Sequence, residues 1–346
     1  MQENVIIPEN YKPVLNIEET EKAISLIKEF FQLNLALELD LIRTTAPLFV
    51  KAGTGLNDNL NGVEKPVSFR AKSLNNQTIE IVQSLAKWKR MILTDYHIPP
   101  GQGIYTDMNA IRPDEELDNI HSLYVDQWDW ERTITPKERH VDFLKSIVQK
   151  IYQVIKRTEK YVCHQYPVIK PYLPDEITFI HSEELAKKYP NMTPKERERQ
   201  ACEENGAVFV IGIGAKLREG QPHDGRAPDY DDWSTPTVNG FKGLNGDILV
   251  YYPLLNTALE LSSMGIRVNA ESLDRQLEQS NNNDRRQLYF HKRLLNGDMV
   301  DSIGGGIGQS RLCMLFLRRA HIGEIQSSIW SDEMIQYCQA HDINIL

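Results

Sequence analysis

A cationic segment of the chain, QSLAKWKR at residues 83–90, brings a hydroxyl group and an ammonium group close together at Ser84 and Lys89. Both groups donate hydrogen bonds, which suits a bound anion. The cationic face of a surface helix would explain the same residues. Both interpretations remain open from this segment alone.

A second segment joins IRPDEE at 111–116 to HSLYVDQWDWE at 121–131. In a strand, alternate side chains face opposite sides. One face then carries Tyr124, Asp126, Trp128 and Trp130, and the other carries Val125, Gln127, Asp129 and Glu131. Polar groups on one side of a central sheet are costly unless they line a wet cavity or bind something. An edge strand with a solvated face is the alternative.

Two further segments concentrate charge. RAPDYDDWSTP at 226–236 crowds acidic residues into a loop bounded by prolines, which a solvated turn would explain equally well. LELSSMGIR at 259–267 places Glu260 and Arg267 on either side of a run of small residues. Small residues let a backbone come close to a ligand, but they also mark ordinary turns.

The glycine-rich run GGGIGQSR at 304–311 precedes an apolar segment that begins near Ser310. Consecutive glycines expose backbone N–H groups, and a helix N-terminus favours anions. The run is not a dinucleotide-binding fingerprint, because Gln309 stands where the third glycine should be and no βαβ unit follows. The sequence also lacks a P-loop motif, so ATP, if bound, is held in another way. A flexible loop before a core helix is the alternative interpretation.

The elements that must position these segments show two kinds of hydrophobic periodicity, one helical and one typical of strands. Helical spacing of apolar residues predicts helices over 17–39, from 136 to about 162, and from about 310 onward. Strand-like runs occupy 103–111, 123–132, 207–214 and 247–255. This order is not a regular βαβ alternation, so we expect a mixed α/β fold of the α+β type with a largely antiparallel sheet. Without repeats or linkers, residues 1–346 are expected to form one domain, with 1–16 as an N-terminal extension.

Bulk composition excludes some classes of function. The 346 residues are 41% hydrophobic and 25% charged, with a formal net charge of -9. Nucleic-acid-binding proteins usually carry a basic stripe, and none is evident. No segment approaches the roughly 20 apolar residues that a membrane span needs, and the N-terminus has no signal-peptide pattern. The four cysteines form no C-x-x-C pair. We therefore expect a cytoplasmic protein with free thiols, and neither nucleic acid nor membrane as a partner.

Taken together, the segments resemble one family. LIRTTAP at 41–47, IRPDEE and the glycine-rich stretch ending in Arg311 are similar to the three signatures of class II aminoacyl-tRNA synthetases. The complete set resembles the ammonia-dependent asparagine synthetases specifically: QSLAKWKR, RPDE, YVDQWDWE, APDYDDWSTP, GLNGDIL, ELSSMGIR and GGGIGQSR. The likeness covers residues 17–330 in order. It implies the class II synthetase catalytic fold, and a homodimer whose interface includes LIRTTAP.

The resemblance also implies a reaction. The β-carboxylate of aspartate would attack the α-phosphate of Mg²⁺-bound ATP, and ammonia would then displace AMP to give asparagine. ATP is thus a substrate, and Mg²⁺ is the expected cofactor. Arg112 is expected to grip the α-phosphate, because its planar fork matches two phosphate oxygens. The expected nucleotide-binding residues are Arg226, Asp231, Asp247, Glu260, Ser262, Gly306 and Arg311. Asp247 and Glu260 are also candidate Mg²⁺ ligands.

The orientation of aspartate needs a further inference. Aspartyl-tRNA synthetase activates the α-carboxylate and holds the side chain with a lysine and an arginine. Here the β-carboxylate must react, so we expect the substrate to be turned end for end. Ser84, Lys89, Ser263 and Arg267 are then expected to bind the aspartate, chiefly its α-carboxylate. Asp58, Gln127 and Asp129 are expected at the ammonium group. Asp58 and Asp129 complete the predicted catalytic set with Arg112, since one carboxylate can take the proton that ammonium loses.

Two alternatives belong to other classes. A class II core that acts on tRNA should carry an anticodon-binding domain or a basic face. A catalytically inactive amino-acid sensor would not need Lys89, Arg112, Asp129 and Arg311 intact. A glutamine-dependent synthetase is disfavoured, because it needs an N-terminal cysteine nucleophile and residue 2 is Gln2.

Overall fold

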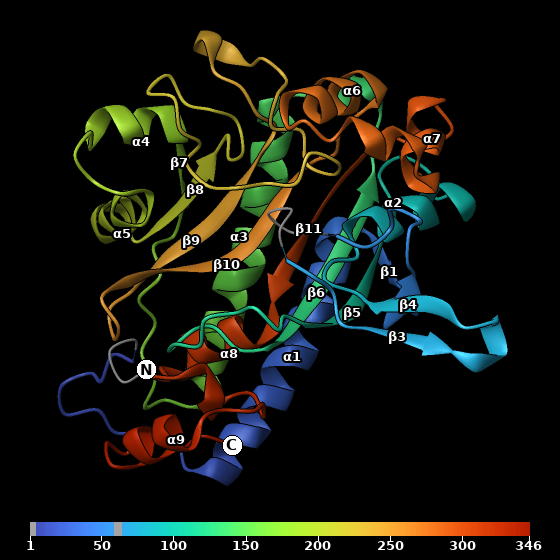
Figure 1. The fold of residues 1–346 in the computed structure, drawn as a ribbon. Helices are drawn as coiled ribbons and strands as arrows, with labels where there is room; N and C mark the ends of the chain where they lie inside the picture. The colour runs from blue at the N-terminus through green and yellow to red at the C-terminus, as the bar shows by residue number, and fades with distance from the viewer. Residues whose placement is uncertain (1–4, 59–63) are drawn as a thin grey trace.

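The computed structural model describes residues 5–58 and 64–346. Its centre is an 8-stranded sheet in the order β1-β5-β6-β11-β10-β9-β8-β7, which crosses the whole molecule in Figure 1. The strands are β1 (Leu41–Arg43), β5 (Gly103–Ile111), β6 (Tyr124–Thr133), β7 (Thr178–His181), β8 (Ala207–Ile211), β9 (Asn245–Tyr252), β10 (Thr257–Ile266) and β11 (Ser302–Gly308). Only the edge pairs β1–β5 and β7–β8 are parallel. The expected, largely antiparallel sheet is confirmed.

Three helices cover one face of this sheet and bury the main core: α1 (Ile17–Leu39), α3 (Val141–Gln165) and α8 (Gln309–Leu317). In Figure 1, α3 runs behind the sheet. Trp128 and Trp130 of β6 point into this core and are 0% exposed, and the Trp128 ring lies 4.7 Å from that of Phe31. The strand alternation of β6 therefore sends Gln127, Asp129 and Glu131 to the opposite face.

The remaining elements surround that opposite face and the ends of the sheet. They are a 3-stranded sheet of β2 (Phe49–Lys51), β4 (Gln77–Ile81) and β3 (Ser68–Ala71), and the helices α2 (Ala86–Asp95), α4 (Ser182–Lys188), α5 (Pro194–Asn205), α6 (Ala270–Gln279), α7 (Tyr289–Leu295) and α9 (Asp332–Gln339). Short 3₁₀ turns are η2 (Lys72–Leu74), η3 (Pro136–Glu138), η4 (Val238–Gly240), η5 (Asn283–Gln287) and η6 (Ile322–Glu324). Within the described ranges, no helix is long and apolar enough to cross a membrane.

Two of the expected elements have the bounds that the sequence predicts. The helix over 17–39 and the strand over 103–111 have the predicted bounds, and Asn16 and Glu19 form the capping box that begins the helix. The other expected elements exist with shifted ends. For example, the helix expected from Pro136 begins at Val141, because Pro136 instead opens the 3₁₀ turn η3.

The glycine-rich run is a central strand, so the interpretation as a flexible loop is wrong. β11 pairs with both β6 and β10. A Cβ at Gly304 would lie 2.0 Å from Glu131 Oε2, and a Cβ at Gly306 would lie 2.3 Å from Gln127 Oε1. Side chains of the neighbouring strands thus occupy the space above these glycines. Glycine is required here because large polar side chains must converge over the strand.

Candidate active site

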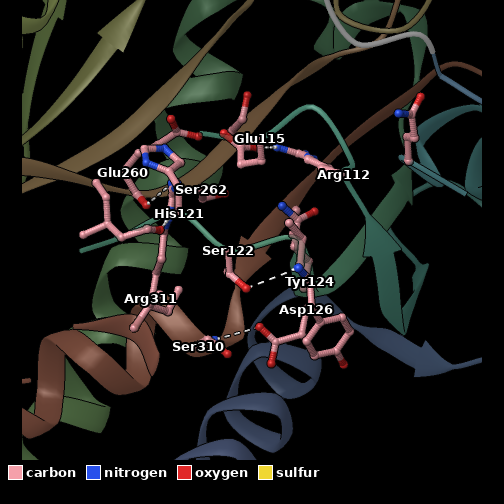
Figure 2. A pocket seen from close by; sticks show the side chains of 18 of the residues that line it. Arg112, Glu115, His121, Ser122, Tyr124, Asp126, Glu260, Ser262, Ser310 and Arg311 are labelled. Atoms are coloured by element: carbon pink, nitrogen blue, oxygen red, sulfur yellow. Dashed lines mark hydrogen bonds and ion pairs between the residues drawn. The ribbon is translucent and has the colours of Figure 1, made fainter. Parts of the chain in front are cut away.

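A cavity of about 440 Å³ lies where β6, β11 and β10 meet the 112–126 segment and the 224–230 loop. Figure 2 shows labelled side chains from the 112–126 segment, β10 and the start of α8 around this cavity. The predicted residues that line it are Arg112, Gln127, Arg226, Glu260, Ser262, Ser263, Gly306 and Arg311. The other predicted residues do not line it: Asp58, Ser84, Lys89, Asp129, Asp231, Asp247 and Arg267. All of these except half-buried Ser84 are buried.

Arg112 stands at the end of β5, where its backbone N–H donates to Leu123 O at 2.8 Å. Its guanidinium lies 3.7 Å from the Glu115 carboxylate, as Figure 2 shows. Its buried Nε has no hydrogen-bond partner among residues 5–58 and 64–346. A half-buried cation with one loose ion pair and an open N–H can accept an anionic ligand.

Arg311, in the first turn of α8, is held by backbone carbonyls. Its Nε donates to Ile120 O at 3.3 Å and its NH1 donates to Glu260 O at 3.2 Å. No ion pair of Arg311 occurs in the described part of the chain. Carbonyl oxygens orient the guanidinium, and its charge lowers the pKa of the nearby Glu260 carboxylate without a direct ion pair to it. A phosphate can therefore still contact the guanidinium directly.

Arg226 forms an ion pair with the carboxylate of Asp247. One of its terminal nitrogens lies 2.5 Å from Asp247 and 3.1 Å from Ser263 Oγ. Burial raises the pKa of Asp247 to about 7, which Arg226 opposes and Glu260 reinforces. Burial would also raise the pKa of Glu260, but Arg311, Arg226, Lys195 and Arg112 together hold it below its usual value. Four cations therefore surround the Glu260 carboxylate.

Two neighbouring carboxylates that repel each other suit a shared divalent cation, which would offset this repulsion. Asp247 and Glu260 fit Mg²⁺ in this respect. The described residues contain no cluster of three or more His, Cys, Asp or Glu side chains suited to a metal. Phosphate oxygens and waters would have to supply the other ligands, as is usual for Mg²⁺.

Lys89 lies beneath the cavity and is 1% exposed. Its Nζ donates to Gly305 O at 3.0 Å and lies 3.2 Å from Asp129 and 4.0 Å from Glu131. Burial lowers its pKa, and these carboxylates oppose that shift. The interpretation of QSLAKWKR as the cationic face of a surface helix is wrong, since Lys87, Lys89 and Arg90 are all buried.

Arg267 is held between two carboxylates. Its NH2 lies 2.8 Å from Glu131, and its NH1 donates to Asp231. Burial alone would raise the pKa of Glu131, but Arg267, Lys89 and a hydrogen bond from Ser302 lower it. Before the substrate binds, Lys89 and Arg267 are therefore already paired. A substrate that lacks the α-carboxylate would therefore not leave these two cations without partners.

The acidic loop 226–236 is not a solvated turn, which corrects that interpretation. Asp229 is 0% exposed and one of its oxygens accepts from Lys87, Arg285 and His291 at 3.2, 2.9 and 2.9 Å. Asp232 is likewise buried and pairs with Arg139 at 2.9 Å. Each acid meets a cation from a distant part of the chain, which sequence patterns cannot show.

Several cavity residues were not singled out as site residues from the sequence. Gln83 is 1% exposed, lines the cavity, and neither atom of its amide has a partner in the described ranges. Its backbone N–H and that of Asp58 both donate to Asn57 Oδ1, at 2.9 and 3.0 Å. The other missed residues include Glu115, His121, Tyr124, Asp126, Lys195 and Tyr230. Glu131 had a signal in the sequence, because it continues the strand face of Gln127 and Asp129.

Ser84 has a structural partner. Its hydroxyl accepts the Ala86 N–H at 3.2 Å, next to the start of α2. It does not line the cavity in this arrangement.

Comparisons with known proteins bear on the family of this chain and confirm the expected class II synthetase fold. The family model described as aspartate-ammonia ligase matches residues 18–342. An aspartate–ammonia ligase of Bacteroides fragilis is 60% identical over 342 residues, covering 99% of each chain. One of Clostridium perfringens is 54% identical over 344 residues, covering 99% of this chain and 100% of the relative. Among solved structures, an asparaginyl-tRNA synthetase of Pyrococcus horikoshii with asparaginyl-adenylate superposes with a TM-score of 0.66 at 15% identity, covering 89% of this chain and 68% of the other.

Proposed function

Since this chain belongs to the aspartate–ammonia ligase family and forms asparagine from aspartate and ammonia, we propose that it works through a β-aspartyl adenylate and releases AMP and pyrophosphate. A carboxylate is a poor electrophile, because its charge repels nucleophiles and oxide is a poor leaving group. Transfer of AMP onto the β-carboxylate removes both obstacles, and ammonia then displaces AMP. The observation that carries this proposal is Arg311, a cation on the cavity that is oriented by carbonyls and makes no direct ion pair with any described residue.

The nucleotide occupies the side of the cavity formed by Arg112 and Arg311. Arg112 holds the α-phosphate, where a preorganised guanidinium stabilises the charge that develops as the phosphorus–oxygen bond breaks. Arg226, Ser262 and Gly306 complete the nucleotide side. Asp231, which was expected there, instead pairs with Arg267 at the aspartate end. Asp247 and Glu260 would hold Mg²⁺, which supplies charge neutralisation to the phosphates when it is bound.

Aspartate occupies the side above β6 and β11. Gln127 and Ser263 line the cavity there. Lys89 and Arg267, joined by Ser84, bind the α-carboxylate, and Asp58 and Asp129 with Gln127 bind the ammonium group. This assignment leaves the β-carboxylate directed at the nucleotide. One of Asp58 and Asp129 accepts the proton that ammonium loses before it attacks.

A homodimer is part of the proposal. β1 is an edge strand, and its Ile42 side chain is 56% exposed. Leu33 and Leu37 on the adjoining helix α1 are 59% and 74% exposed. An exposed apolar surface at a sheet edge favours a two-fold partner. Sedimentation of an active 39.8 kDa monomer at micromolar concentration would contradict the dimer.

Phosphorus NMR of a turnover mixture tests the adenylate mechanism. AMP and pyrophosphate should appear in step with asparagine. ADP and inorganic phosphate appearing in step with asparagine would overturn the adenylate mechanism. Aspartate-dependent exchange of pyrophosphate into ATP without ammonia provides a second test, because only a reversible adenylation step supports it.

A further inference from the structure

One residue on the cavity comes from a helix that carries none of the motifs described above. Lys195, in the first turn of α5, lines the cavity together with Asp224 and Arg226. Its side chain is 71% exposed, so a ligand can reach its ammonium group. A cation in the first turn of a helix is disfavoured by the helix dipole. Helix formation therefore does not explain this lysine.

Two buried side chains hold Lys195 in place. Its Nζ lies 3.1 Å from Glu198 Oε2, and Glu198 Oε1 lies 3.0 Å from His223 Nε2. Glu198 and His223 are each 3% exposed. An ordinary exposed ion pair three residues apart on a helix contributes little and needs no buried carboxylate behind it. The chain Lys195–Glu198–His223 instead fixes a positive charge at the rim of the cavity.

The charge around Lys195 indicates the chemistry of its ligand. Lys195 is one of four cations near Glu260, and the other three are Arg112, Arg226 and Arg311. Arg226 is paired with Asp247 at 2.5 Å and its side chain is only 12% exposed. Lys195 is also paired, with Glu198, but its side chain is 71% exposed. ATP brings several negative charges, of which Arg112 is assigned the one at the α-phosphate. The more distal phosphates need a further cation that remains accessible.

We propose that Lys195 binds the β- and γ-phosphates of ATP and the pyrophosphate released from them, with Glu198 and His223 as positioning residues. This inference rests on the proposed adenylate mechanism. When the bond between the α-phosphorus and its bridging oxygen breaks, that oxygen becomes a terminal oxygen of pyrophosphate and gains negative charge. Lys195 stabilises this leaving group. It lies on α5, which is outside the three signature motifs.

The test uses Lys195→Met, which removes the charged ammonium group and keeps an unbranched, flexible side chain. Loss of one hydrogen bond to a charged group should weaken pyrophosphate binding about tenfold to hundredfold. Calorimetric titration with pyrophosphate and with AMP measures this. The AMP affinity should stay within about twofold, because AMP lacks the β- and γ-phosphates. The control is Lys188→Met, which breaks an exposed ion pair with Glu204 of 2.5 Å on α4, and should leave both affinities unchanged.

Two further variants separate binding from folding. Lys195→Arg should restore most of the pyrophosphate affinity, since it restores the charge. Glu198→Gln should raise the KM for ATP while leaving the KM for aspartate unchanged, because the lysine stays present but loses its anchor. Glu198→Gln could also lower the unfolding temperature and raise the KM for both ATP and aspartate. In that case His223→Gln provides the same comparison, because His223 holds Glu198 from the other side.

The outcomes distinguish this inference from the mechanism on which it rests. If wild-type enzyme makes AMP and pyrophosphate, but Lys195→Met binds pyrophosphate within twofold of wild type, the inference about Lys195 is wrong and the mechanism stands. Equal losses of pyrophosphate and AMP affinity would also overturn it, since they would indicate a general structural effect. If wild-type enzyme makes ADP and phosphate, the proposed mechanism itself fails.

Discussion

The two ends of the cavity prepare for an anionic substrate in opposite ways. At the aspartate end, Lys89 and Arg267 are buried and already paired with Asp129, Glu131 and Asp231. At the nucleotide end, Arg112 and Arg311 are half-buried, and their partners are a carboxylate at 3.7 Å and two backbone carbonyls. One end is a closed network of charges, and the other offers cations that are still available.

We expect the aspartate end to determine substrate specificity and the nucleotide end to contribute mainly binding affinity and catalysis. A buried network holds its charges in fixed positions, so it recognises the placement of an ammonium group and a carboxylate. Half-buried arginines attract any phosphate group that comes close, so they stabilise the bound nucleotide even when its phosphates are slightly displaced. We therefore expect changes at the aspartate end to harm folding and selectivity together. Changes at the nucleotide end should harm catalysis and leave the fold intact.

Glu131→Gln should have the largest effect on stability. It removes the charge that faces Arg267 and Lys89 in a fully buried position, and breaking such a pair from one side costs about 3–5 kcal/mol. Urea unfolding measures the free energy. The matched control is Glu115→Gln at the nucleotide end, where the half-buried pair with Arg112 should contribute less than about 1 kcal/mol. Similar losses in both variants would remove the distinction between the two ends.

Arg112→Lys should have the largest effect on catalysis. One ammonium cannot make two parallel contacts to the phosphoryl oxygens, so kcat should fall by about 10²–10³. Its unfolding free energy should stay close to that of wild type, because Arg112 has only one loose ion pair. A fall in kcat below about tenfold would place Arg112 outside the reacting centre.

β-Alanine sharpens the comparison at the aspartate end, because it keeps an amino group and a reactive carboxylate but lacks the α-carboxylate. Since Lys89 and Arg267 have partners without it, its rejection reflects lost charged hydrogen bonds and not unpaired buried cations. We expect kcat/KM to be about 10² lower than for aspartate. Lys89→Met should narrow this gap, mainly by harming aspartate. If kcat/KM for both substrates falls by the same factor, Lys89 does not bind the α-carboxylate.

The pH dependence of stability should give the smallest effect. The pKa of Glu131 in the folded protein lies below its ordinary value of 4.5, because Arg267 and Lys89 outweigh the effect of burial. The unfolded chain then binds the proton first as pH falls, so the stabilisation present above pH 4.5 is lost on acidification through the folded pKa. The stability gap between wild type and Glu131→Gln should narrow below pH 4.5, by about 1.4 kcal/mol per unit of pKa shift. A gap that is constant with pH would show that Glu131 is not held ionised by these cations.

The sequence alone supplied the local structure and the identity of the motifs. Apolar spacing predicts the first helix with its observed ends, and the structure shows the Asn16 cap that begins it. The alternation in YVDQWDWE predicts which side chains share a face of β6. Both are set by neighbours within a few residues, so short patterns carry them.

Only the tertiary structure decided which charges are paired and which remain available. Glu131 and Arg267 are 136 residues apart in sequence, and Lys87 and Asp229 are 142 apart. The same lysine-rich and aspartate-rich segments would be solvated if their partners did not meet. Burial and pairing depend on the packing of distant strands, and they determine whether a charge is a fixed support, as in Lys89, or an accessible one, as in Arg311 and Lys195.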